Sequence, residues 1–337
     1  MDPLTDAFLI AAVQATPIFH DLAASLAKAC DLIAEAGRAG AKLAVFPEGF
    51  LPSYPLWAWV VPTFRYDEMR ELYSELLENA VAVPGPTTDT LCKAAAAAGV
   101  NVVIGINELN TEASGTTLYN SLLFISEGGR LLGKHRKLIP SAAERVVHAQ
   151  GDGSTLQVFD TSVGRLTGLI CWENYMPLAR YALYSWGTQI LAAPTWDRGE
   201  PWTSTLRHIA KEGRIYVVGC CSPTRRSDIP DRYNFKHAHL PAEMDWINVG
   251  GSAIIDPDGA FLVEPVNQRE EILYAEVQPR KLRGPRFQLD VAGHYARPDL
   301  FHLTVDRRPH SVVHTLEVEP AAEVEETEKG TETGTRS

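Results

Sequence analysis

Short apolar runs alternate along this chain with longer segments whose apolar residues recur at helical spacing. Residues 8–14, 42–46 and 100–106 form such runs and predict buried strands. Residues 21–39 and 66–80 have apolar positions at helical spacing and predict helices. Further strands are predicted at 118–126, 130–135, 156–159, 165–170, 189–193, 215–221, 252–255 and 260–263, and further helices at 88–98, 176–184 and 202–212.

This order of elements predicts an α/β layered fold with mixed sheets, because strands alternate with helices and two pairs of strands form hairpins. The hairpin turns are Glu127-Gly128-Gly129 and residues 256–259. The chain has no internal repeat and no linker before its end, so we expect one domain over residues 1–309. Residues 310–337 are rich in Glu and Thr and lack aromatic residues, which predicts an acidic, solvated tail.

Composition limits the classes of function. With 337 residues, 45% of them hydrophobic, the chain can bury a large core. A net charge of −11 argues against nucleic acid as a partner, since a phosphate backbone requires a basic surface. Five cysteines without a CxxC spacing indicate neither a disulfide framework nor a zinc site. The start of the chain is acidic and no apolar run is long enough to span a membrane, so we expect a cytoplasmic protein without membrane partners.

Cys171 lies where the predicted strand 165–170 ends and shortly before the predicted helix 176–184. Backbone N–H groups and the partial positive charge of a helix N-terminus favour thiolate over thiol, which would make Cys171 a nucleophile. The alternative is an inert buried cysteine that only fills space. The other polar residues near strand ends decide between these two interpretations.

Three further polar residues could complete a site. Glu48 follows a strand that ends in Pro47, where open α/β sheets bind their ligands. Lys137 and Glu144 lie in one segment after the strand 130–135. Each residue has a simpler explanation by itself. Glu48 could be a surface acid at the start of a loop, Lys137 a solvated cation, and Glu144 a neighbour of Arg145 on a short helix. Together, a base, a cation and a thiol form a constellation with a mechanism.

Five motifs in this order resemble those of the nitrilases, the nitrile-hydrolysing branch of the carbon-nitrogen hydrolase superfamily. They are FPEGF, HRKLIPSAAER, GDGS, LICWENYMPLARYAL and GHYARPDLFHLTVD, and the similarity extends from about residue 8 to about residue 306. The amidase and carbamoylase branches usually carry a different sequence after the cysteine. The stretch CWENYMPL is therefore what indicates nitriles as substrates.

The resemblance implies a catalytic triad of Cys171 as nucleophile, Glu48 as general base and Lys137 as the cation that stabilises the intermediate. It implies that Glu144 helps to orient the site. The implied fold is a four-layer α-β-β-α sandwich with mixed sheets, whose subunits pair and often assemble into larger spirals. No metal and no cofactor is expected.

Chemistry alone supports these roles. A thiolate adds to the weakly electrophilic nitrile carbon and gives a thioimidate, from which water releases ammonia and leaves a thioester. A second water gives the acid, whereas departure of the thiol would give an amide. Glu48 alternates between base and acid, and the charge that develops meets Lys137 and the backbone N–H of Trp172.

The chain departs from the family pattern near the expected pocket. The departures are His148 in place of Trp, Ala149 in place of Gly, Ser141 in place of Thr, Gly49 in place of Ala, and Trp196 in place of a small residue. We expect that His148 and Trp196 reshape the acyl pocket and that Tyr54 and Trp57 form its walls. The alternatives are a partly exposed loop histidine for His148, and plain core packing for Tyr54 and Trp57.

Other functions remain open at this point. An amidase or carbamoylase would use the same triad on amides, and a cyanide hydrolase would differ mainly in pocket size and tail. A non-catalytic assembly protein is a third alternative, although it has no need of Glu48, Lys137 and Cys171 together. A papain-like hydrolase is disfavoured because no histidine lies in a recognisable motif.

Overall fold

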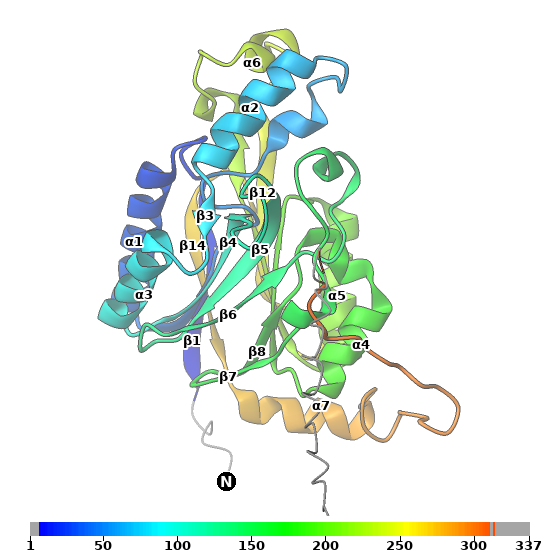
Figure 1. Cartoon of the computed structure of the whole chain (residues 1–337). Coiled ribbons are helices and arrows are strands. Elements are labelled where there is room, and N and C mark those ends of the chain that lie inside the picture. The colour runs from blue at the N-terminus through cyan, green and yellow to red at the C-terminus, as the bar shows by residue number, and fades with distance from the viewer. Residues whose placement is uncertain (1–6, 311–312, 314–337) are drawn as a thin grey trace, which may run out of the picture.

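The structure of the chain is a computed structural model, and it describes residues 7–310 and 313. Two β-sheets face each other in the middle of the molecule, and helices cover the outer face of each sheet (Figure 1). This is the predicted four-layer α-β-β-α sandwich. Of the predicted tail, only His310 and Val313 are described, so the boundary at residue 309 stays a prediction.

The described residues form two sheets of seven strands each. The first has the order β14-β1-β2-β4-β5-β6 with β3 beside β4, and the second has the order β11-β12-β10-β9-β8-β7 with β13 beside β12. The first sheet comprises β1 (Phe8–Gln14), β2 (Ala41–Val45), β3 (Val81–Ala82), β4 (Asn101–Leu109), β5 (Leu118–Ile125), β6 (Leu131–Arg136) and β14 (Glu271–Val277). The second comprises β7 (Phe159–Thr161), β8 (Gly164–Gly168), β9 (Ile190–Thr195), β10 (Tyr216–Cys221), β11 (Pro223–Arg225), β12 (Trp246–Ile255) and β13 (Phe261–Asn267).

Four helices form the outer layers. The helices α1 (Leu22–Arg38) and α3 (Pro86–Ala98) cover the first sheet, while α4 (Pro177–Ser185) and α5 (Glu200–Gly213) cover the second. At the upper end of the sandwich in Figure 1 lie α2 (Tyr66–Glu78) and α6 (Asn234–Ala238), and at the lower end lies α7 (Arg283–Gln288). None of the helices in the described ranges has the length and apolar character needed to cross a bilayer.

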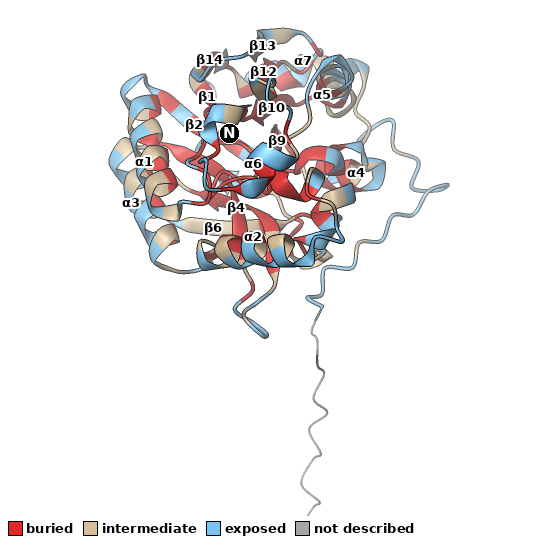
Figure 2. Cartoon of the chain, turned by 90° about the horizontal axis from the view of Figure 1, so that it is seen from above, coloured by how far each residue is buried: buried red, intermediate tan, exposed pale blue. Residues whose placement is uncertain are grey.

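The apolar runs of the sequence are strands that are buried on both faces. In β1, Ile10 and Ala12 pack against the second sheet, whereas Ala11 and Val13 pack against the helices. Side chains of a strand alternate between its two faces, so a strand between two apolar layers needs apolar residues at nearly every position. Burial is accordingly concentrated in the strands and on the inner faces of the helices (Figure 2).

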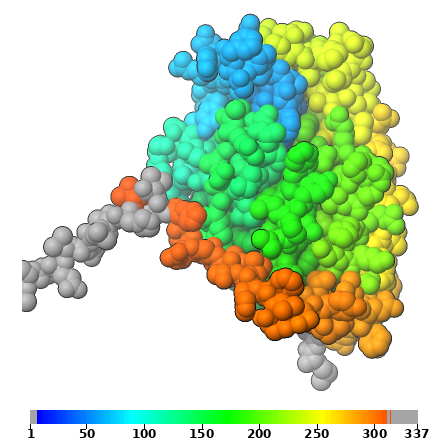
Figure 3. Space-filling model, turned by 90° about the vertical axis from the view of Figure 1, so that its right-hand side faces the viewer, coloured from blue at the N-terminus to red at the C-terminus, as the bar shows by residue number. Residues whose placement is uncertain are grey.

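The chain after α7 turns back along the molecule and runs over its surface, where it is drawn in orange in Figure 3. The backbone N–H of His310 donates to Asp152 Oδ2 at 2.7 Å. Val305 packs against the apolar cluster between the second sheet and its helices. The domain therefore uses residues almost up to its predicted end.

One predicted strand needs correction, and the strands β3, β11 and β14 were not predicted. The strand predicted at 156–159 is wrong for most of its length, because Leu156 ends a 3₁₀ turn and β7 begins only at Phe159. The sequence reading also missed β14, which pairs antiparallel with the whole of β1. Both the hairpin of β5 with β6 and that of β12 with β13 are confirmed.

Candidate active site

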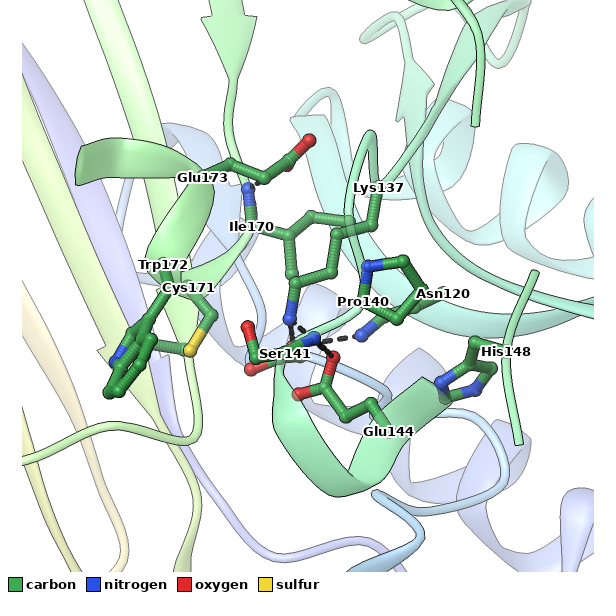
Figure 4. Close-up of polar contacts among 12 residues, drawn as sticks. Asn120, Lys137, Pro140, Ser141, Glu144, His148, Ile170, Cys171, Trp172 and Glu173 are labelled. Carbon is green, nitrogen blue, oxygen red and sulfur yellow. Dashed lines mark hydrogen bonds and ion pairs between the residues drawn. The ribbon is translucent and has the colours of Figure 1, made fainter. Parts of the chain in front are cut away.

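Residues that follow three strands meet at one end of the sandwich. Glu48 follows β2, Lys137 follows β6, and both belong to the first sheet. Cys171 follows β8 of the second sheet. Figure 4 shows the Cys171 sulfur on the side of its turn that faces the Lys137 ammonium group. The structure thus brings the predicted residues together from both sheets.

The Lys137 ammonium group binds two carboxylates in the interior. Its Nζ donates to Glu48 Oε1 at 2.8 Å and to Glu144 Oε2 at 2.7 Å. All three side chains are buried. One positive charge faces two potential negative charges, and buried like charges resist ionising together. The carboxyl groups of Glu48 and Glu144 must therefore differ in pKa.

Hydrogen bonds decide which carboxyl group ionises first. Glu144 accepts from Lys137, from the Ser141 backbone N–H at 2.9 Å and from the Tyr54 hydroxyl at 2.7 Å. Burial raises its pKa, but these donors outweigh burial and the pKa of Glu144 is lowered. Glu48 accepts on Oε1 only, and its Oε2 has no hydrogen-bond partner among the described residues. Burial, helped by the Glu144 charge and opposed by Lys137, raises the pKa of Glu48 to about 7.

Asn120 belongs to this site although the sequence reading did not select it. Its Nδ2 donates to Glu48 Oε1 at 2.8 Å, and its backbone carbonyl accepts from the Lys137 N–H at 2.8 Å. Asn120 therefore holds Glu48 from the side opposite to its free oxygen. The sequence signal that could have identified Asn120 is the polar pair Asn120-Ser121 inside the largely apolar strand β5.

Cys171 occupies a strained position on a tight turn. Its φ of 51° lies in the left-handed region that non-glycine residues seldom adopt, and it starts the 3₁₀ turn Cys171–Tyr175. The helix α4 begins only at Pro177, later than the sequence predicted. The turn thus projects the thiol from the end of the second sheet toward the carboxylates of the first.

The prediction from the turn alone, that its N–H groups favour the thiolate, is wrong for Cys171, whereas the expectation that Glu48 takes the thiol proton stays a prediction. Burial raises the pKa of Cys171 to about 12, the Glu48 charge adds to this, and Lys137 opposes it. A thiol surrounded by two carboxyl groups and little water gains less from a turn of backbone N–H groups than it loses by desolvation. The thiol consequently needs a base at the moment of attack.

Tyr54 and Trp196 form one wall beside the carboxylates. Their rings stack with centroids 4.5 Å apart and planes 12° apart. The Tyr54 hydroxyl reaches Glu144, and Trp59 Nε1 donates to the same hydroxyl at 2.8 Å. Both rings also line an internal cavity of about 10 Å³, together with residues such as Phe19 and Ser222. Tyr54 therefore contacts both this small cavity and Glu144.

Two other predicted pocket residues are buried. Trp57 lies in an apolar cluster with Tyr54, and its Nε1 donates to His20 Nε2 at 3.2 Å. His148 Nε2 lies 2.8 Å from Asn107 Oδ1. Burial lowers the pKa of His148 to about 4, so the ring is neutral near pH 7. The alternative of a partly exposed histidine is wrong, since only 5% of His148 is exposed.

Trp172 points away from the carboxylates, although its backbone adjoins the nucleophile. Trp172 is about half exposed, and its Nε1 donates to Asp197 Oδ2 at 2.8 Å. Figure 4 shows the indole on the far side of Cys171 from Glu144. The indole of Trp172 therefore bonds to a residue outside the carboxylate cluster. Within residues 7–310 and 313, no group of three or more His, Cys, Asp or Glu side chains is arranged to hold a metal ion.

Comparisons with known proteins give the family of the chain. A family model described as carbon-nitrogen hydrolase matches residues 9–286. The chain is 41% identical over 310 residues to an aliphatic nitrilase of Sinorhizobium fredii, with 91% of this chain and 98% of that protein covered. It is 39% identical over 312 residues to nitrilase 2 of Arabidopsis thaliana, with 89% of each chain covered. A bifunctional nitrilase/nitrile hydratase of Lupinus angustifolius is 40% identical, with 89% and 86% covered.

A solved structure shows the same fold. The crystal structure of Saccharomyces cerevisiae Nit3, a member of branch 10 of the nitrilase superfamily, superposes with a TM-score of 0.68. The alignment covers 88% of this chain and 98% of the yeast chain at 24% sequence identity. At that identity the likeness concerns the fold.

Proposed function

The chain belongs to the carbon-nitrogen hydrolase family, and from this premise we propose that it is a nitrilase, which converts an organic nitrile and two waters into a carboxylic acid and ammonia. The observation that carries the proposal is the buried Lys137 ammonium group, which binds both carboxyl groups beside a strained thiol. The high pKa of the thiol makes a nearby base necessary, and Glu48 has an unoccupied oxygen to serve as one.

The first step joins sulfur to the nitrile carbon. Glu48 Oε2 takes the proton from the Cys171 thiol as sulfur attacks, and the nitrile nitrogen gains that proton from Glu48. The product is a thioimidate in which carbon has one bond to sulfur and a double bond to nitrogen. A base with a pKa of about 7 can accept and return one proton at neutral pH, which suits this exchange.

The second step exchanges nitrogen for oxygen. Glu48 removes a proton from a water that attacks the thioimidate carbon, and the tetrahedral species then carries oxygen, nitrogen and sulfur. Lys137 and the Trp172 N–H stabilise the charge on this species. Glu48 passes the water proton to nitrogen, which becomes an amino group, and then carries the proton of the new hydroxyl group to that amino group. The carbon-nitrogen bond breaks as the carbonyl forms, ammonia leaves, and a thioester remains. A second water then breaks the carbon-sulfur bond, which gives the acid and restores the thiol.

Glu144 has a different role from Glu48. Its three hydrogen bonds keep it ionised, so it holds Lys137 as a cation and does not exchange protons with the substrate. The ion pair also fixes the ammonium group at the point where charge develops. We assign Glu144 as a residue that orients the site.

Ammonia release is the direct test of this function. Aliphatic, aromatic and arylacetonitriles, the matching amides and cyanide are incubated with wild type and with Cys171→Ala. Ammonia from organic nitriles, abolished by the substitution, is expected. Activity on amides alone would place the chain among the amidases, activity on cyanide alone among the cyanide hydrolases, and no activity would favour a non-catalytic protein. Measuring the amide formed from each nitrile gives the product ratio.

The pocket proposal concerns His148 and Trp196. Trp196 stacks on Tyr54 and therefore adds bulk beside the site, whereas His148 is smaller than a tryptophan would be. We expect Trp196→Ala to raise the rates on aryl and arylacetonitriles relative to small aliphatic nitriles. His148→Trp is expected to shift the ranking in the opposite direction. An unchanged ranking in both variants would contradict a role of these residues in substrate choice.

Self-association to a dimer and to a larger spiral homo-oligomer remains a proposal. It is supported by exposed apolar side chains on the second helical layer, among them Trp172, Tyr175 and Leu178. A cytoplasmic location also remains a proposal, and cell fractionation tests it.

A further inference from the structure

The side chain of Glu173, two residues after the nucleophile, is buried and makes an unusual set of bonds. Its Oε2 accepts from the Ile170 backbone N–H at 2.7 Å, and its Oε1 accepts from the Leu138 backbone N–H at 2.5 Å. His135 Nε2 lies 3.2 Å from Oε1 and 3.1 Å from Oε2. One carboxylate thus binds three groups, two of them on the backbone.

These two backbone groups adjoin the two reacting side chains. Ile170 directly precedes Cys171, and Leu138 directly follows Lys137. Ile170 follows β8 of the second sheet, whereas Leu138 follows β6 of the first. The Glu173 carboxylate therefore bridges the two sheets at the point where each delivers a catalytic group, as Figure 4 shows for Glu173, Ile170 and Lys137.

His135 fixes the carboxylate from its third side. The His135 ring is buried, and its Nδ1 lies 3.3 Å from the Thr155 carbonyl oxygen. Both ring nitrogens therefore face oxygen atoms that accept hydrogen bonds. Two backbone N–H groups donate to this carboxylate and the buried imidazole lies against its remaining side, so the bridge between the two backbones is restrained.

We propose that Glu173 is a positioning residue of the reaction, which sets the distance between the Cys171 thiol and the Lys137–Glu48 pair. The proposal rests on the proposed function for its kinetic consequence. Glu173 touches no reacting atom; it acts through the Ile170 and Leu138 backbones. Catalytic groups must be held within about 0.5 Å of their working geometry. Because Cys171 and Lys137 come from different sheets, a small shift between the sheets would separate them.

The test uses Glu173→Gln, which keeps the shape of the side chain. Its amide offers one oxygen in place of two, so either the Ile170 or the Leu138 N–H loses its acceptor. We expect kcat to fall by about 10- to 100-fold while KM changes less than about twofold, because the substrate still binds but the thiol is displaced. Glu173→Asp keeps the charge but shortens the side chain, and it is expected to reduce kcat likewise.

Gln14 supplies a matched control. It is also buried and also bridges the sheets, since its Oε1 accepts from Ser252 N–H at 2.8 Å and its Nε2 donates to the Val266 carbonyl at 2.9 Å. Gln14→Glu is again an exchange of equal shape. We expect it to lower the melting temperature without the selective loss of kcat. Equal losses of kcat in Gln14→Glu and Glu173→Gln would overturn the proposal, and so would an unchanged kcat in Glu173→Gln.

A second measurement does not depend on nitriles. Alkylation of Cys171 by iodoacetamide, followed on its peptide by mass spectrometry, is expected to be at least about fivefold slower in Glu173→Gln than in wild type, since the thiol moves away from Glu48. Gln14→Glu should match wild type. Equal alkylation rates in all three proteins would overturn the proposal. If wild type were inactive on every nitrile, the proposed function would be refuted. The alkylation rates of wild type, Glu173→Gln and Gln14→Glu would still test whether Glu173 positions Cys171.

Discussion

Glu48 and Glu144 share one ammonium group, but they are held by different numbers of donors. Three groups donate to Glu144, whereas Lys137 and Asn120 donate to one oxygen of Glu48 and leave the other without a partner. Donors stabilise the ionised form, so the pKa of Glu144 is lowered while burial raises that of Glu48. This difference supports the proposal that Glu48 is the proton carrier of the pair.

The first prediction concerns the pH dependence of kcat/KM. Glu48 acts as a base only when ionised, so activity should be present above about pH 7 and should fall about tenfold per unit as the pH drops below this value. Glu48→Gln should lose about 10²- to 10⁴-fold in kcat/KM. His148→Asn is the control. It should show the same fall of kcat/KM below pH 7, because the pKa of His148 is lowered to about 4 and its ring is already neutral between pH 5 and pH 7. A rate that is flat from pH 9 to pH 5 would contradict the assignment of Glu48.

Sequence reasoning selects residues whose type is itself chemical. Cys171, Glu48, Lys137 and Glu144 were selected from strand ends and from the resemblance; the structure brings them together, and their roles stay predictions. It failed for the state of the thiol, because burial and neighbouring charges depend on the fold and not on local spacing. It also missed Asn120, whose importance arises only when β5 is placed beside the Glu48 loop.

At the scale of elements, the Glu48 loop is held against a glycine of β4. A Cβ at Gly105 would lie 2.3 Å from the Pro47 carbonyl oxygen and 2.5 Å from the Gly49 nitrogen. The Leu51 N–H also donates to the Gly105 carbonyl at 3.1 Å. The close approach of these two backbones therefore sets the position of Glu48.

The second prediction uses this contact. Gly105→Ala should push the loop away from β4, lower kcat by at least about tenfold and lower the melting temperature, since backbone atoms cannot move aside as side chains do. Gly284→Ala is the matched control, because a Cβ there meets no atom within 4 Å. Steady-state kinetics and thermal unfolding of both variants provide the measurement. Wild-type kcat in Gly105→Ala would show that the loop does not depend on this approach.

Most elements could be predicted because buried strands and amphipathic helices leave strong patterns. The edge strand β14 left a weaker one, since its charged residues Glu271 and Glu276 interrupt the apolar pattern. The strand predicted at 156–159 was wrong because an apolar pattern is present there without a strand. Leu156 and Val158 are apolar because they pack in the cluster between the second sheet and its helices, but their backbone continues from a turn without strand pairing.

At the scale of the whole molecule, the second helical layer exposes apolar side chains beside the nucleophile turn. Leu178, in the first turn of α4, is 66% exposed. Trp172 and Tyr175 are exposed on the preceding turn, with ring centroids 6.1 Å apart. An exposed apolar group of this kind suits an interface with a second copy of the chain.

The third prediction is that Leu178→Glu reduces the particle size in solution, because a charge in an apolar interface remains without a partner. Phe64→Glu is the control, since Phe64 is 73% exposed at the α2 end of the sandwich. Light scattering after size-exclusion chromatography measures both. If Leu178→Glu and wild type have the same mass, the α4 surface is not an interface between copies.

The central claim is that Cys171 carries the substrate as a covalent intermediate. The most direct measurement is to quench wild type with acid during turnover of a nitrile and to determine the mass of the Cys171 peptide. The account predicts an added mass equal to the thioimidate or thioester of that nitrile, absent in Cys171→Ala and formed much more slowly in Glu48→Gln, which lacks the base that takes the thiol proton. An active enzyme with no adduct on Cys171, or with the adduct on another cysteine, would contradict it.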